Sequence, residues 1–327
     1  MSTARLLLPV LFILAIASVG FALFAGPADV PAAAVWGALT GGHADTAERI
    51  VRELRLPRAL SAFVVGGLLS LAGALMQVLL RNPLADPYVL GVSGGAAVAA
   101  LASMLAGLAG FWVSLDAFGG ALASMLIVFG LAHGRGGWTP TRLLLTGVVV
   151  AAGWSAAVSF LLAVSPDRSL RGMLFWLMGD LANADGPGWT TLVLAGGLGL
   201  GFVLARPLNL LARGDLQARA LGVAVGPLRV AIYLAASLLT AAAVTIAGSV
   251  GFVGLVVPHM LRIVGGADHR WLLPASVLGG GTLLVLADAL ARVVLAPQQL
   301  PVGVVTALLG VPMFLFLLQR GAGRQYR

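Results

Sequence analysis

The chain has 327 residues, of which 60% are hydrophobic and 10% charged, with a formal net charge of +8. Water-soluble domains carry about a quarter charged residues, so this composition excludes a soluble globule and favours a membrane protein. Cysteine is absent, which excludes disulfides, thiolate metal sites and cysteine nucleophiles. Every basic residue is an arginine. In a membrane chain we interpret this positive charge as cytoplasmic anchoring, not as a nucleic-acid surface.

The hydrophobic residues form unbroken stretches of about twenty positions, the length at which a helix crosses about 30 Å of hydrocarbon. We therefore predict an all-α integral membrane protein that is a single transmembrane domain over 1–327, and not a barrel. The ten predicted spans are residues 6–24, 59–80, 92–112, 116–133, 143–164, 190–205, 230–247, 249–264, 271–292 and 301–319.

The first stretch, 6–24, has an alternative interpretation. Arg5 precedes an apolar run that ends in small residues, a pattern shared with secretory signal peptides. A run of about nineteen apolar positions is long for such a peptide, so we expect a retained helix. With a cytoplasmic amino terminus most of the arginines fall on the inner side, which agrees with the positive-inside rule and predicts that both termini are cytoplasmic.

Two segments are too polar to span. The later half of 25–58, from His43 to Arg58, is charged and should lie in or on the outer interface. Segment 206–229 should form two short amphipathic helices separated near Gly214. The similarity of 70–73 to 245–248 predicts two inverted five-helix halves. No GK[ST] phosphate loop occurs, so the chain has no nucleotide site of its own.

Four stretches carry a family resemblance: LRLPRAL at 54–60, RNPLADPYVLGVSGGA at 81–96, GDLQARALG at 214–222 and GFVGLVVPHMLR at 251–262. In this order and spacing they resemble the bacterial inner-membrane permeases that import iron–siderophore complexes, haem and cobalamin. The resemblance extends from about residue 50 to the carboxyl terminus. It implies a homodimer or pseudo-dimer with ten spans per subunit, two cytoplasmic ATPase subunits that bind ATP and Mg, and usually a periplasmic binding protein. This chain itself would bind no cofactor and no metal, and would be no enzyme.

The resemblance assigns segment 206–229 to contact with the ATPase subunits. Such a contact needs a rigid projecting helix, with Leu216 and Leu221 apolar and a polar fringe around them. The residues assigned to this coupling role are Arg213, Gly214, Asp215, Leu216, Ala218, Arg219, Leu221 and Gly222. The alternative is an amphipathic helix that lies on the membrane surface.

The stretch that begins at Arg81 should end the second span in a tight turn at the cytoplasmic face, because it combines proline and glycine. By resemblance, Asn82 and Leu84 form the cytoplasmic gate and Thr141 belongs to its second layer. The sequence departs from the pattern at Pro140, where the cobalamin permease has a small hydroxyl residue.

Three arginines, Arg55, Arg58 and Arg292, fall on the outer side, against the positive-inside trend. The resemblance implies that they pair with glutamates of the binding protein. The alternative is local pairing. Asp288 and Arg292 are four residues apart on one helix, and Glu53 could hold Arg55 or Arg58.

Segment 165–190 resembles an outer re-entrant helix beside the transport pathway. Its candidate lining residues are Met173, Phe175, Trp176 and Met178, whose adaptable or aromatic side chains suit a bulky chelate. An interfacial aromatic belt would explain Trp176 and Trp189 equally well. His259 has no His, Asp or Glu three or four residues away, so we expect it to pack or to form a hydrogen bond.

These observations favour the permease subunit of an ATP-driven importer for a metal chelate that works by alternating access. An ion-coupled secondary transporter would need acids at the membrane midplane, and only Asp288 qualifies. An intramembrane enzyme would need a nucleophile beside His259 or Asp288, and the sequence offers none. No residue reports which chelate is carried.

Overall fold

The computed structural model describes residues 2–41, 45–133 and 139–325, and every regular element in these ranges is a helix. In chain order the helices are α1 (Ser2–Phe24), α2 (Ala32–Thr40), α3 (Thr46–Arg49), η1 (Ile50–Arg55), α4 (Leu56–Leu79), η2 (Pro87–Leu90), α5 (Val92–Leu105), α6 (Phe111–Ala132), α7 (Pro140–Val164), α8 (Asp167–Met178), α9 (Thr190–Leu211), α10 (Asp215–Ala220), α11 (Val225–Ala247), α12 (Val253–Gly265), α13 (His269–Val293) and α14 (Val302–Gln325).

Seven of the helical segments are long and apolar enough to cross a membrane, and one of them runs without a break from Thr46 to Leu79. Three shorter apolar helices, Val92–Leu105, Val253–Gly265 and Val302–Leu317, correspond to the remaining predicted stretches. The prediction of an all-helical, many-times-spanning architecture is therefore confirmed for the described part of the chain.

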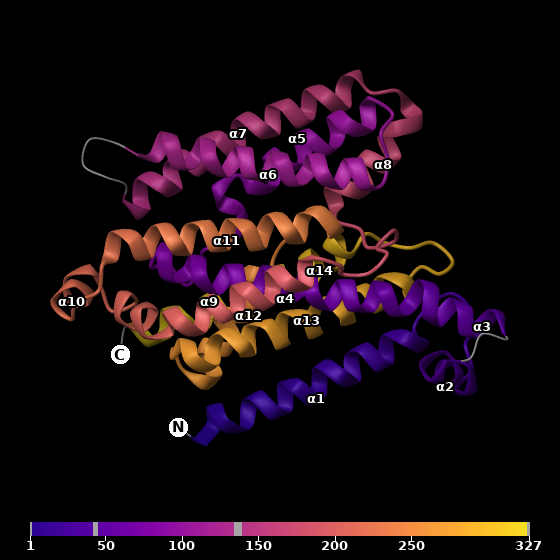
Figure 1. The fold of residues 1–327 in the computed structure, drawn as a ribbon, viewed down its shortest axis with the longest axis horizontal. Coiled ribbons are helices and arrows are strands. Elements are labelled where there is room, and N and C mark those ends of the chain that lie inside the picture. Colours follow the sequence, from indigo (N-terminus) through magenta and orange to yellow (C-terminus); the bar gives the residue numbers. More distant parts are fainter. Residues whose placement is uncertain (1, 42–44, 134–138, 326–327) are drawn as a thin grey trace.

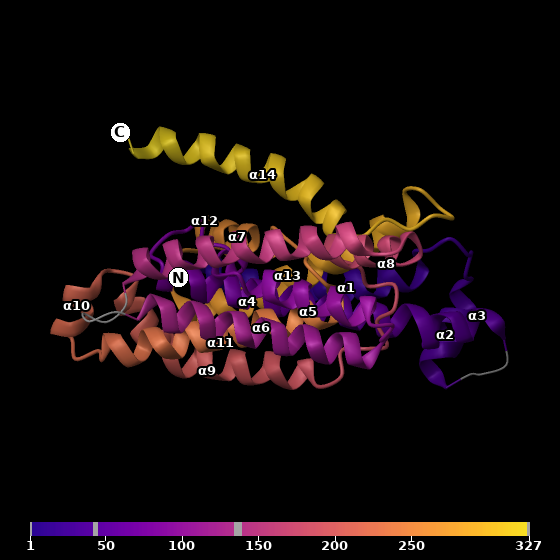
Figure 2. The same cartoon turned by 90° about the horizontal axis from the view of Figure 1, so that it is seen from above.

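The long helices lie side by side in one bundle (Figure 1). At one end, here called the α10 end, lie α10, the start of α1 and the end of α14. At the opposite end, the α2 end, lie α2, α3, α8 and the loop between α13 and α14. Seen from above, α14 diverges from the other helices as it runs toward the α10 end (Figure 2).

Helix α4 forms the centre of the bundle, because almost all of its side chains from Ser61 to Leu79 are buried. It packs against α11, α12 and α13. Small residues permit this close packing: a Cβ on Gly66 would overlap the Gly280 carbonyl, and a Cβ on Gly73 would overlap the Gly254 carbonyl. Helices in lipid associate through such small-residue contacts, since lipid supplies no hydrophobic drive between them.

Replacing Gly73 with valine is expected to destabilise the bundle severely, because α12 cannot move without breaking its other contacts. The matched control is Gly196→Val on α9, where nothing lies within 4 Å of an added Cβ. The melting temperature in detergent, together with the yield of monodisperse protein, should fall for the first variant and stay near wild type for the second. Equal melting temperatures would show that the α4–α12 contact is not tight.

Several predicted boundaries were wrong. Span 92–112 was too long, because α5 ends at Leu105 and the chain then turns with positive φ at Gly107 and Gly110. Span 190–205 was too short, because α9 continues through Pro207. The first of the two short helices predicted in 206–229 is therefore the end of α9, and only α10 is separate.

Candidate functional site

Helix α10 projects from one end of the bundle (Figure 1). Gly214 precedes it with a φ of 122°, a conformation that favours glycine, and this turn redirects the chain after α9. Ala218 is fully buried, whereas Leu216 and Leu221 are 85% and 64% exposed. Large apolar side chains exposed together on a segment too polar to span suit contact with a partner or with the membrane surface. The predicted projecting helix is present, and we call residues 213–222 the α10 knob. Its contact with an ATPase stays a prediction.

The exposed fringe of this knob includes Arg213 and Arg219, as expected. Asp215 differs from the expectation because it has partners within the chain. Its carboxylate accepts hydrogen bonds of 2.8 and 2.6 Å from Arg229 of α11, and Arg81 lies 3.7 Å away. Asp215 therefore connects α10 to α11 and to the end of α4. No local pattern signals this pairing, since Arg229 is fourteen residues away across a turn.

The predicted turn after α4 is confirmed. The Asn82 N–H donates to the Gln77 carbonyl at 3.1 Å, and the Asn82 side-chain oxygen accepts from the Leu84 N–H at 2.9 Å. This side-chain bond is an Asx turn, which explains why asparagine suits the position. Asn82 is exposed and Leu84 is half-buried.

The other candidate gate residue, Thr141, is exposed in the first turn of α7. Thr139 caps this helix, because its hydroxyl accepts from the Arg142 N–H at 3.2 Å. Gly147 of α7 lies against the backbone of Val89 and Leu90. These two residues follow the turn that contains Asn82 and Leu84. This meeting point lies six residues beyond Thr141 in the chain, and the gate role of Thr141 stays a prediction.

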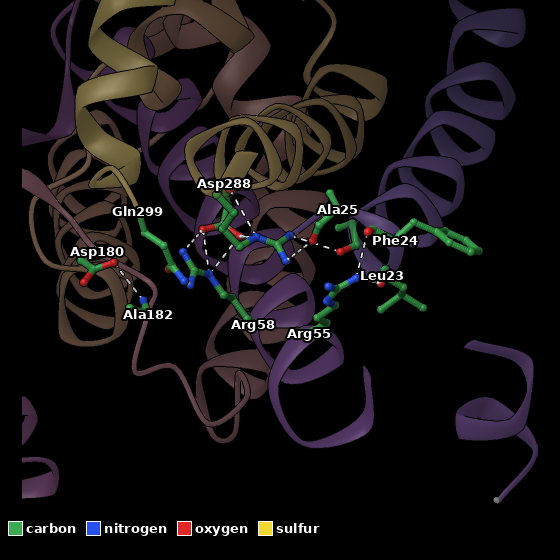
Figure 3. A network of polar contacts seen from close by, with 11 residues as sticks. Leu23, Phe24, Ala25, Arg55, Arg58, Asp180, Ala182, Asp288 and Gln299 are labelled. Atoms are coloured by element: carbon green, nitrogen blue, oxygen red, sulfur yellow. Dashed lines mark hydrogen bonds and ion pairs between the residues drawn. The ribbon is translucent and has the colours of Figure 1, made fainter. Parts of the chain in front are cut away.

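At the α2 end, three predicted docking arginines form an internal network (Figure 3). Arg58 donates to both carboxylate oxygens of Asp288 at 2.8 to 3.1 Å and to the Gln299 side chain at 2.7 Å. Arg292 lies 3.1 Å from the same carboxylate. Asp288, Arg292 and Arg58 are only 1%, 3% and 7% exposed.

Arg55 and Arg292 also bind the carboxyl end of α1 (Figure 3). The acceptors are the carbonyl oxygens of Leu23, Phe24 and Ala28 for Arg55, and of Ala22 and Ala25 for Arg292. The last carbonyls of a helix lack partners within it and carry partial negative charge, so they favour a nearby cation. The Asp288 carboxylate, the end of α1 and the chain just after it, with the nearby charge of Asp29, together offset three buried guanidinium groups.

This geometry bears on the docking expectation, which stays a prediction. Arg55, Arg58 and Arg292 are buried with partners inside the chain, so they could reach a binding protein only by leaving those partners. Of the alternatives, the pairing of Asp288 with Arg292 is confirmed. The pairing of Glu53 with Arg55 or Arg58 is wrong, because Glu53 pairs with Arg49 at 3.4 Å. The sequence did not reveal the bond between Arg58 and Asp288, which joins residues 230 positions apart.

Two of the four candidate lining residues, Phe175 and Trp176, line a cavity of about 320 Å³ at the α2 end. The ends of α5 and α11 and the start of α6 complete the cavity, and its polar groups come from Ser114, Asp180, Asn183 and Thr245. A mostly apolar cavity with a few placed polar groups is typical of small-molecule sites. Sequence reasoning missed these four residues, which come from three separate segments: α6, the loop after α8, and α11.

Met173 and Met178 are not part of this cavity. Met173 is fully buried, and the Ser165 hydroxyl lies 3.2 Å from its sulfur. It is therefore a packing residue in this structure, and Met178 is 37% exposed outside the cavity. His259 is half-buried with its Nδ1 unpartnered among the described residues, so the expected hydrogen bond is not seen at that atom. No group of three His, Cys, Asp or Glu side chains converges in the described ranges.

Comparison with known proteins decides the family: residues 11–320 match the FecCD transport family. The chain belongs to the FecCD family. It is 45% identical over 280 residues to the hemin transport system permease protein HmuU of Yersinia pestis, with 82% of each chain covered. It is 42% identical to the vitamin B12 import system permease protein BtuC of Salmonella paratyphi A, with 84% of this chain and 85% of the relative covered.

A third FecCD relative is the iron(3+)-hydroxamate import system permease protein FhuB of Bacillus subtilis, 39% identical over 90% of this chain and 78% of that protein. Among solved structures, an inward-facing metal-chelate-type ABC transporter is 30% identical and has a TM-score of 0.84, with 96% of this chain and 98% of that chain covered. As a FecCD permease with several apolar spans, the chain is a multi-pass protein of the inner membrane.

Proposed function

We propose that this FecCD permease carries a metal chelate from a periplasmic binding protein to the cytoplasm by alternating access, driven by ATP hydrolysis on partner subunits. The observation that supports it best is α10, whose exposed Leu216 and Leu221 suit an apolar contact with an ATPase. The relatives named for hemin, vitamin B12 and iron(3+)-hydroxamate define the candidate substrates. ATP and Mg would be bound by the partner and no cofactor by this chain.

The proposed assembly is a homodimer with two ATPase subunits. Only Leu143 and Gly147 of α7 are buried, although the helix is 25 residues long. Figure 2 places α7, α8 and the diverging α14 along one side of the bundle. We propose that the second copy covers this side and that 1–327 acts as one permease domain.

The proposed orientation has ten spans, with the α10 end and both termini in the cytoplasm. Two long helices, α4 and α11, each precede a shorter apolar helix, α5 and α12, although η2 interrupts the connection after α4. This shared pattern supports the proposed inverted five-helix halves. The cavity beside Trp176 would then lie on the periplasmic side of the pathway, and the turn with Asn82 and Leu84 would gate its cytoplasmic side.

The binding protein would dock at the α2 end, over loops that the buried arginines position. Arg58 binds Gln299 in the loop before α14, where residues 294–299 are exposed, and Arg55 binds the chain after α1. The arginines would thus shape the docking surface from inside the protein.

An ion-coupled transporter fits less well. Asp288, the acid that such a mechanism would need, is shared by two arginines at about 3 Å. Its charge therefore offsets two buried cations of the fold, so Asp288 is not a free intramembrane acid of the kind that such a transporter needs.

The proposal predicts ATP-dependent uptake. Proteoliposomes that contain this chain, the ATPase and the binding protein should accumulate haem, cyanocobalamin or ferrichrome only when ATP is present with the ATPase, and proton or sodium ionophores should not stop them. Uptake without the ATPase, or its collapse with an ionophore, would instead support the ion-coupled alternative.

The orientation can be tested with single cysteines, because the chain contains none. Leu216→Cys on α10 and Gln298→Cys in the loop before α14 are both exposed positions. A membrane-impermeant maleimide added to spheroplasts should label Gln298→Cys and spare Leu216→Cys until the membrane is opened. The reverse labelling pattern would invert the proposed topology.

A further inference from the structure

A second cavity, of about 260 Å³, lies at the α10 end of the bundle. It is bounded by the ends of α4 and α9, the end of α12 and the start of α13, and its polar lining residues are Gln77, Arg81, Arg262 and His269. One water molecule occupies about 30 Å³ of liquid, so this space admits a larger polar group. It lies beside the proposed gate turn, which contributes Pro83, and beside Asp215 of the coupling segment, which lies 3.7 Å from Arg81.

The cavity carries positive charge that the chain offsets only in part. The Arg262 side chain has no hydrogen bond or ion pair within the described ranges and is half-buried. Arg81 has Asp215 as its nearest acid, at 3.7 Å, and that carboxylate already accepts two shorter bonds from Arg229. Two guanidinium groups at one cavity favour an anion, above all a phosphate, whose oxygens match their N–H groups.

Two of the lining residues also have a buried acceptor without a partner among the described residues: Gln77 Oε1 and His269 Nε2, neither of which is exposed. Gln77 is 3% exposed and His269 is 1% exposed. The Gln77 amide nitrogen donates to the Leu255 carbonyl, which leaves only its oxygen free. Buried polar atoms without partners are costly, so both atoms call for a donor.

The neighbours of His269 determine its tautomer. Asn209 donates through its amide nitrogen to Asp268 at 2.7 Å, so the Asn209 oxygen faces His269 Nδ1 at 2.6 Å. An amide oxygen can only accept, hence Nδ1 carries the hydrogen and Nε2 of the neutral ring is an acceptor. The cavity therefore combines two cationic side chains with two lining residues whose acceptor atoms no donor in the described ranges satisfies.

The backbone gives a third observation. Arg81 has a φ of 48°, in the left-handed region that favours glycine at a helix end. An L-residue other than glycine, asparagine or aspartate is disfavoured there, and such strain points to a role for the side chain. The sequence keeps an arginine where glycine would relax the turn.

We propose that this cavity binds a phosphate group, the chemistry shared by inorganic phosphate and the headgroup of phosphatidylglycerol. Arg81 and Arg262 bind the phosphate oxygens. The bound group joins the ends of α4, α12 and α13 beside α10, next to the ion pair between Arg81 and Asp215.

The test uses the full-length chain, delipidated in detergent. Binding of dioleoyl phosphatidylglycerol and of dioleoyl phosphatidylcholine is measured by native mass spectrometry, and the melting temperature is measured in phosphate and in chloride at equal ionic strength. The variants are Arg262→Gln and Arg81→Gly. The control is Arg206→Gln, an exposed arginine of α9 that does not line the cavity.

Wild type is expected to prefer phosphatidylglycerol over phosphatidylcholine, and both cavity variants to bind it about tenfold more weakly or worse, the loss expected for one charge-assisted hydrogen bond. Arg81→Gly should melt no lower than wild type in chloride, because glycine adopts the positive φ of this turn without strain. Weaker lipid binding by this variant would therefore not result from misfolding. Stabilisation by phosphate as well as lipid shows that the free ion suffices, whereas stabilisation by lipid alone identifies the headgroup. Equal binding of the two lipids, or an equal loss in Arg206→Gln, overturns the proposal.

Discussion

Replacing Leu216 and Leu221 together with glutamate is expected to release the ATPase subunits while the permease stays folded and inserted. The two side chains are 85% and 64% exposed, so they contribute little to the fold of the isolated chain. Burying a leucine in an interface contributes about 1.5 to 3 kcal/mol, and the pair about 3 to 6 kcal/mol per knob, or roughly two to four powers of ten in affinity. Co-purification of the ATPase and ATP-driven uptake should both be lost.

The matched control for this prediction is Gln217→Glu, which adds a charge to the same helix at an exposed position without removing an apolar side chain. It should retain the ATPase. Arg219→Gln, which removes one exposed charge, should weaken the complex by no more than about 1 kcal/mol. If the double leucine variant co-purifies as well as Gln217→Glu does, α10 is not the contact, and the helix instead lies on the membrane surface.

The sequence predicted those parts of the fold that local composition determines. Each of the ten apolar stretches corresponds to a helix because a membrane helix must be continuously apolar and satisfy its own backbone. The turn at Asn82 and the exposed leucines of α10 were also predictable, since proline, glycine and amphipathic spacing act within a few residues.

Contacts over long sequence distances were not predictable. The charge of Arg58 suggested a surface position, yet Arg58 is paired with Asp288, 230 residues away in the chain. Arg55 donates to main-chain carbonyls, which no sequence pattern reveals. The same limit explains Asp215, whose partner Arg229 lies on the next helix. The apparent breach of the positive-inside trend at the outer arginines has a structural explanation, because these charges are buried and compensated.

The Asp288 carboxylate offers the sharpest test of this explanation. Asp288→Asn keeps the shape of the side chain but removes the one negative charge that Arg58 and Arg292 share. Breaking a buried ion pair by removing one partner costs about 3 to 5 kcal/mol, because the remaining charge is buried without compensation. We expect a large fall in melting temperature and in the yield of folded protein. Asp185→Asn, an exposed acid before α9, should have almost no effect.

A double variant separates charge imbalance from lost hydrogen bonds. Adding Arg58→Gln to Asp288→Asn removes one uncompensated cation, while Arg292 keeps the carbonyls of Ala22 and Ala25. The double variant should therefore melt higher than Asp288→Asn alone, although it lacks more of the original contacts. If the second change lowers the melting temperature further, hydrogen-bond count matters more than charge. If Asp288→Asn melts like Asp185→Asn, the arginines are free to move, and direct docking of a binding protein by Arg55, Arg58 and Arg292 becomes the better account.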